Sequence, residues 1–119
     1  MKNKFGSQRG FTLIEIMLVV SLIGLLAVIS IPNFLKARTT SQRTVCINNL
    51  RQISSAVQQW ALEMKKDATS PVTAADVLPY MKAVVVCPAG GTTFGDSYSL
   101  DTVADNPTCQ QSPLSHQLQ

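Results

Sequence analysis

The stretch that decides the fold is Phe11–Ile31, FTLIEIMLVVSLIGLLAVISI, in which Glu15 is the one charged side chain. At about 1.5 Å per residue, a helix over these 21 residues is roughly 31 Å long, enough to cross the hydrocarbon core of a bilayer. The stretch therefore predicts a membrane-spanning helix over residues 11–31. A secretory signal peptide and a permanent single-span anchor are alternatives. The run is long for a signal peptide and lacks a clean small-x-small cleavage site, and neither alternative explains Glu15.

Glu15 needs a partner, because a carboxylate inside an apolar span costs about 2.5–3.5 kcal/mol on insertion scales. No Lys, Arg or His lies between Phe11 and Ile31, so the span supplies no cation. A cut between Gly10 and Phe11 would supply one. It would remove a basic N-terminal segment and create an α-amino group four residues before Glu15.

The sequence Gly10-Phe11-Thr12-Leu13-Ile14-Glu15 resembles the processing site of type IV prepilins and type II secretion pseudopilins. The resemblance includes a short basic leader, a small residue before the cut and an acid five residues into the mature chain. Gly24 and Pro32 also stand where this family usually has glycine and proline. The resemblance implies that a membrane prepilin peptidase removes residues 1–10 and methylates the new amino group of Phe11.

Two roles for Glu15 follow from this resemblance and from helix electrostatics. In one, Glu15 neutralises the amino group of a neighbouring subunit and sets the register of the polymer. In the other, it neutralises its own amino group and the positive end of its own helix. The resemblance also implies that residues 24–32 can lose helical order in a filament, with Gly24 and Pro32 as the site of the break. A simple kink at Pro32 is the alternative.

Beyond Pro32 the pattern predicts an amphipathic helix over residues 32–66, ended by the stop signal Asp67–Pro71. Asn49 is expected to lie off its apolar face. Residues spaced by three and four predict one narrow apolar stripe that covers the C-terminal region: Cys46, Leu50, Ile53, Val57, Trp60, Ala61 and Met64.

Residues 67–119 are expected to form a small C-terminal domain. Thr73–Asp76 has the form of a capping box and predicts a short helix. Ala83–Val86 is β-prone, and Gly95-Asp96 is typical of a hairpin turn. Residues 110–119 resemble a loose tail. The predicted fold class is α+β and pilin-like: a long N-terminal α-helix followed by a small domain that contains a β-hairpin.

The three cysteines allow several arrangements. Cys87 and Cys109 flank the predicted hairpin, and a disulfide between them would contribute roughly 3 kcal/mol by the loop-entropy model. Cys46 lies on the apolar stripe as a buried thiol, or pairs with either of the others. The three cysteines and His116 could also provide three sulfurs and one nitrogen for zinc. Because no CxxC or HxxxH spacing is present, we expect no metal site and no cofactor.

Composition and charge exclude several classes of function. The formal net charge is +3, but from Phe11 onward seven basic residues face seven acidic ones. No aromatic residues interleave the basic stretch Lys36–Arg51, so we expect contact with lipid headgroups or solvent and no nucleic acid. The chain has no HExxH, GxSxG or glycine-rich phosphate loop, so we predict no catalytic residues. Three acids could bind calcium but lack EF-hand spacing: Asp96, Asp101 and Asp105.

The resemblance implies a structural subunit of a pilus-like filament, and the short C-terminal region favours a major pseudopilin of a type II secretion system. The alternatives are a type IV pilin for adhesion, motility or DNA uptake and, from another class, a monomeric membrane-anchored zinc-binding module. The implied partners are copies of itself, minor pilins, the prepilin peptidase, an inner-membrane assembly platform and, before assembly, lipid. The chain would cross the inner membrane once and then enter a periplasmic or cell-surface filament.

Overall fold

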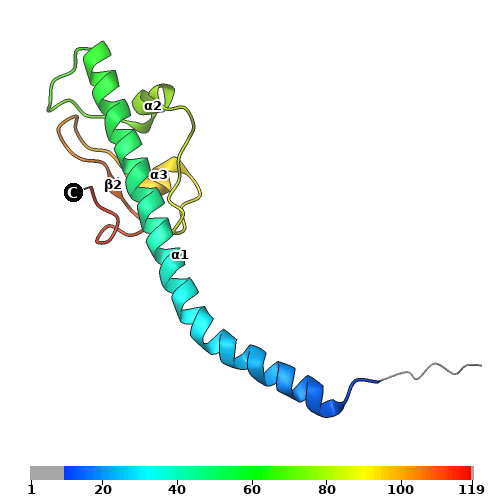
Figure 1. Ribbon diagram of the computed structural model, residues 1–119. Helices are drawn as coiled ribbons and strands as arrows, with labels where there is room; N and C mark the ends of the chain where they lie inside the picture. Colours follow the sequence, from blue (N-terminus) through cyan, green and yellow to red (C-terminus); the bar gives the residue numbers. More distant parts are fainter. Residues whose placement is uncertain (1–9, 119) are drawn as a thin grey trace, which may run out of the picture. The chain divides into compact units, whose positions relative to one another are not determined.

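The computed structural model describes residues 10–118. The chain divides between Lys36 and Ala37 into two compact units. The long helix α1 (Leu13–Glu63) contributes to both units (Figure 1). All but the last residue of the predicted leader, residues 1–10, lies outside the described residues.

In the first unit, α1 is long and apolar enough to cross a membrane, as predicted for residues 11–31. The helix begins at Leu13, two residues later than the predicted Phe11. It continues through Gly24 and Pro32, although Pro32 has no N–H to donate to the carbonyl of Val28. A loss of helical order in a filament stays a prediction.

In the second unit, α1 buries the predicted apolar stripe almost entirely. The prediction that Met64 belongs to this stripe was wrong, because Met64 is exposed. The helix ends at Glu63 and not at the predicted Lys66. Lys65 has a φ of 50° and so leaves the helical conformation. The amide of Lys66 then donates to the carbonyl of Ala61 at 2.9 Å, which closes the end of the helix.

Two capping boxes shape the region after α1. Thr73 and Asp76 start α2 (Ala74–Val77), as predicted, and the 3-10 turn η1 (Leu78–Tyr80) follows. Thr93 and Asp96 start a second helical turn, α3 (Phe94–Ser97), at the place predicted to be a hairpin turn. That prediction was wrong because the amide of Thr93 donates to the Asp96 carboxylate at 3.0 Å, and this bond favours a helical turn.

The sheet consists of two short antiparallel strands, β1 (Tyr98–Ser99) and β2 (Thr108–Cys109), with Tyr98 opposite Cys109. The predicted α+β class is therefore confirmed, although the strands lie later in the chain than expected. Ala83–Val86 does not form a strand. The carbonyl of Val86 instead accepts a hydrogen bond from the side chain of Asn49, at 3.1 Å.

The core of the second unit lies between α1 and the segments that follow it. Figure 1 shows α2, α3 and β2 beside this part of α1, and side chains from all four enter one cluster. The expected loose tail after residue 110 was an error, because His116 is buried and Leu118 packs against the core. The cluster contains these fourteen buried residues: Cys46, Leu50, Ile53, Ala56, Val57, Trp60, Ala61, Val72, Val77, Cys87, Phe94, Tyr98, Val103 and Cys109.

Candidate assembly segment and cysteine–histidine cluster

The assembly segment, residues 11–31, exposes its large apolar side chains along its whole length. Leu13 is 78% exposed and Leu25 is 65% exposed. An apolar surface this large is not stable in water, so it marks a site for lipid or for another protein. The two partners are chemically equivalent for this surface, because lipid tails are as apolar as leucine.

Glu15 has a partner within its own first helical turn. Its carboxylate accepts a hydrogen bond from the Thr12 amide at 2.8 Å and another from the Thr12 hydroxyl at 2.9 Å. The Glu15 amide in turn contacts the Thr12 hydroxyl oxygen at 3.4 Å. This is a capping box, and the Thr-x-x-Glu spacing could have been recognised in the sequence.

The predicted cleavage site precedes the helix. Gly10 and Phe11 are both exposed and lie outside α1. A peptide bond in exposed, non-helical chain can enter a protease site without unfolding a helix. The geometry is compatible with processing there.

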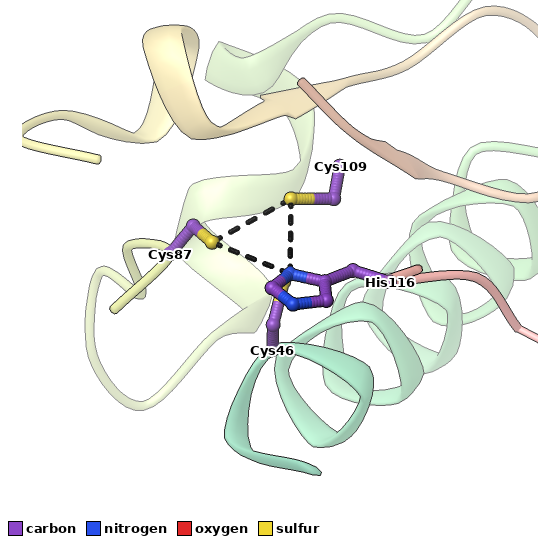
Figure 2. A group of neighbouring side chains, drawn as sticks. All are labelled: Cys46, Cys87, Cys109 and His116. Atoms are coloured by element: carbon purple, nitrogen blue, oxygen red, sulfur yellow. Dashed lines mark hydrogen bonds between the residues drawn. The ribbon is translucent and has the colours of Figure 1, made fainter. Parts of the chain in front are cut away.

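The cysteine–histidine cluster consists of Cys46, Cys87, Cys109 and His116. Figure 2 shows these four side chains converging from separate segments. Cys46 comes from α1, Cys109 from β2, Cys87 from the chain before α3, and His116 from a turn near the C-terminus. All four are buried, with exposed fractions of 0%, 0%, 1% and 5% in chain order.

The ligand atoms of the cluster are close to one another. The sulfur of Cys87 lies 3.5 Å from that of Cys109, and each contacts His116 Nδ1, at 3.8 Å and 3.7 Å respectively. All four ligand atoms, including Cys46 Sγ, lie within 4.8 Å of one another. The predicted pair Cys87 and Cys109 is adjacent, at a separation longer than the 2.05 Å of a bonded pair, and a disulfide between them stays a prediction.

Local backbone geometry positions two members of the cluster. The amide of Gly91 donates to the carbonyl of Cys87 at 2.9 Å, which forms a tight turn at that cysteine. The amide of His116 donates to the carbonyl of Ser112 at 2.9 Å, so one helical turn directs the imidazole inward.

Burial controls the ionisation of the cluster. It raises the pKa of Cys46, and hydrogen bonding with Cys109 adds to the effect. It also raises the pKa of Cys87. Burial lowers the pKa of His116, and the nearby Arg43 guanidinium lowers it further. The protein alone therefore favours neutral thiols and a neutral imidazole.

The three candidate calcium ligands do not converge. Asp96 accepts hydrogen bonds from Thr92 and Thr93, and Asp105 accepts one from Thr102. Among residues 10–118, neither these two nor Asp101 belong to a group of acids able to hold a metal ion.

Comparison with known proteins places these features in context. Residues 6–31 match the family model described as the prokaryotic N-terminal methylation motif. The type IV major fimbrial protein FimA of Dichelobacter nodosus is 33% identical over 106 residues, which cover 83% of this chain and 68% of FimA. No solved structure matches the chain.

Two other relatives match over about half of this chain. The type IV major pilin protein PilA of Myxococcus xanthus is 46% identical over 56 residues, 47% of this chain and 26% of PilA. The type II secretion system core protein G of Klebsiella michiganensis is 33% identical over 64 residues, 54% of this chain and 45% of that protein. The chain thus spans less than half the length of these two relatives.

Proposed function

Because this chain belongs to the family of type IV pilins and type II secretion pseudopilins, whose members are structural subunits and not enzymes, we propose that it polymerises into a pilus-like filament. The observation that carries this proposal is the exposed apolar surface of residues 11–31, with Glu15 in its first helical turn. That surface needs a partner, and identical copies supply one.

The proposed sequence of events starts in the inner membrane, with residues 11–31 in lipid. The prepilin peptidase cuts between Gly10 and Phe11 and methylates the amino group of Phe11. The assembly platform then moves subunits, with minor pilins, into a filament where apolar side chains leave lipid for one another. Close packing between helices drives this step, because lipid and protein are equally apolar.

Glu15 is proposed to act at both stages. In the free subunit its carboxylate bonds to Thr12 and lies at the positive end of the helix, which lowers the cost of holding it in lipid. In the filament it neutralises the amino group of Phe11 in a neighbouring copy. A subunit that enters out of register leaves the carboxylate without that cation, which disfavours its incorporation.

A major pseudopilin of a type II secretion system is the first candidate within the family. The similarity to a type II secretion core protein supports it. A type IV pilin is the second candidate, because the match to a fimbrial protein extends over 106 residues and so reaches into the C-terminal domain.

Intact mass under non-reducing conditions tests the proposal, with protein taken from both sheared surface material and membranes. We expect a chain that starts at Phe11 and carries one methyl group. Recovery in the sheared fraction would support the pilus candidate, and restriction to membranes would support the pseudopilus. A chain that retains residues 1–10, or one cut near Ala27 or Ser30, would contradict the filament proposal.

The variant Glu15→Leu tests the assembly step separately. We expect it to insert in the membrane and to be processed, but not to enter filaments beside wild-type subunits. Asp67→Asn is the matched control, since Asp67 is an exposed acid after the end of α1. Efficient incorporation of Glu15→Leu would show that Glu15 does not set the register.

A further inference from the structure

We propose that Cys46, Cys87, Cys109 and His116 form a zinc site that holds the C-terminal domain to α1. The sequence contains three cysteines and one histidine, and the fold brings all four to one point. The site is independent of filament assembly, and its presence in a single subunit needs no second copy.

The ligand geometry suits a tetrahedral ion. With Zn–S near 2.3 Å and Zn–N near 2.0–2.1 Å, two sulfurs on a zinc ion lie about 3.8 Å apart and a sulfur and nitrogen about 3.6 Å apart. The measured separations are 3.5 Å between Cys87 and Cys109, and 3.8 and 3.7 Å from these sulfurs to His116 Nδ1. Three edges of the tetrahedron are therefore already present.

Cys46 supplies the fourth ligand. Its sulfur lies within 4.8 Å of the other three ligand atoms, so binding requires a closure of about 1 Å at most. At present it donates to the Tyr98 hydroxyl at 3.7 Å, a weak contact that zinc binding would replace. Three thiolates and one imidazole are a closed structural ligand set for zinc, with no open position for substrate.

A disulfide explains less of this arrangement. A bond between Cys87 and Cys109 would use two of the four groups and leave Cys46 and His116 buried beside it without a function. Zinc uses all four. Zinc binding would also set the protonation state of the site. The three thiols would lose their protons to solvent, and His116 would remain neutral as the nitrogen ligand.

The surroundings support an ion with three thiolates, whose net charge is one negative. Arg43 is near enough to His116 to act on it electrostatically, and its positive charge would offset this excess. A surface hollow next to His116 offers an entry path, and Thr40, Gln42, Arg43 and Ser115 line it together with His116.

A metal ion at this position would stabilise a domain that has little regular secondary structure. After α1, the described regular structure consists of the four-residue helices α2 and α3, the three-residue turn η1 and two strands of two residues. Domains with so little secondary structure are commonly stabilised by a metal or by disulfides. Zinc would join α1 to three segments that follow it in the chain.

The test is the metal content of the full-length chain, extracted from membranes in detergent without chelators. We expect one zinc per chain by elemental mass spectrometry, and cysteines that react with an alkylating agent only after zinc is removed. Replacement of zinc by cobalt should give the absorption bands of a tetrahedral thiolate site. X-ray absorption should show three sulfurs near 2.3 Å and one nitrogen near 2.0–2.1 Å.

Cys46→Ser separates the zinc site from a disulfide, because a Cys87–Cys109 disulfide would form regardless of Cys46. We expect the zinc affinity to fall by at least about 100-fold, since even residues outside the first shell of a metal site contribute 10–100-fold. Val45→Ser, at the exposed neighbour of Cys46 on α1, is the matched control and should keep its zinc.

Cys46→Ser could also lose zinc because it fails to fold, and His116→Cys excludes this explanation. It retains four ligands, so it should keep one zinc and shift the cobalt spectrum towards that of a four-sulfur site. A wild-type chain without zinc would overturn the proposal, whether its mass is lower by two hydrogens, as in a disulfide, or corresponds to three free thiols. None of these results depends on whether the chain forms filaments.

Discussion

The side-chain amide of Asn49 donates a hydrogen bond to the hydroxyl of Tyr98 at 2.9 Å, inside the core and next to Cys46. The same amide donates to the carbonyl of Val86 at 3.1 Å. One side chain of α1 thus satisfies both a strand residue and the chain just before Cys87. It shares the buried face of α1 with the apolar stripe.

Removal of this amide should destabilise the C-terminal domain. We expect Asn49→Ala to lower the free energy of unfolding by about 1–3 kcal/mol, because the buried Tyr98 hydroxyl and the part-buried Val86 carbonyl lose a donor. Trp60, the single tryptophan, lies in the same core and reports urea unfolding of the detergent-solubilised chain. Exposed Asn48 is the control, and Asn48→Ala should stay within about 0.5 kcal/mol of wild type. Equal effects of the two variants would contradict this role for Asn49.

Gly91 and Gly95 should respond to alanine in opposite ways. A Cβ at Gly91 would overlap the buried Ser97 hydroxyl and approach the backbone nitrogen of Cys87 to 3.0 Å. We expect Gly91→Ala to cost about 1–3 kcal/mol through overpacking. A Cβ at Gly95, inside α3, meets nothing within 4 Å. Gly95→Ala should therefore stabilise the chain by up to about 1 kcal/mol through helix propensity. The same urea titration measures both, and a stabilising Gly91→Ala would refute the packing argument.

The Asp96 carboxylate should make stability depend on pH. Hydrogen bonds from Thr92 and Thr93 lower its pKa from 3.8 to about 2. A group whose pKa falls on folding stabilises the folded state above its unfolded pKa, and this contribution is lost as the pH drops through the folded value. We therefore expect wild type to exceed Asp96→Asn in stability at pH 5, and the difference to shrink towards pH 2.

The comparison with Asp96→Asn removes other effects of acid, since those act on both chains. Asp105→Asn is a suitable control, because Asp105 is exposed and accepts one hydrogen bond, from the Thr102 hydroxyl. It should retain the pH dependence of wild type. A constant difference between wild type and Asp96→Asn from pH 5 to pH 2 would count against the capping role.

Loss of the Thr12 hydroxyl should loosen the start of α1. We expect Thr12→Ala to cost the first turn about 0.5–2 kcal/mol, the usual value of an N-terminal cap. Hydrogen exchange of the chain in detergent micelles measures this as faster exchange of the amides near Glu15. Thr44→Ala is the control, since that hydroxyl bonds to the Thr40 carbonyl within the helix. If Thr12→Ala left exchange near Glu15 unchanged, the cap would have no energetic value.

Several features could be predicted from local sequence. Helix α1 was predicted from the apolar run Phe11–Ile31 and from the stripe between Cys46 and Ala61. Both signals are local, because a helix is recognised from the spacing of apolar residues along the chain. The Thr73–Asp76 box predicted α2 in the same way. The capping box formed by Thr93 and Asp96 was an equally good signal for a helix. Because Gly95-Asp96 is also typical of a hairpin turn, the sequence led to the wrong prediction there. A segment's secondary structure can be predicted from its sequence when the segment carries only one such pattern.

The sequence by itself therefore determined the long apolar helix, its amphipathic continuation and the resemblance around Gly10–Glu15. Only the tertiary structure decided that Asn49 is buried, and that the chain after residue 110 returns to the core. It alone also brought together Cys87 and Cys109, 22 residues apart, with His116 a further seven along. Loops connect these residues, and the path of each loop depends on the packing of the whole domain. The spacing of these residues in the sequence therefore does not predict their distances in space.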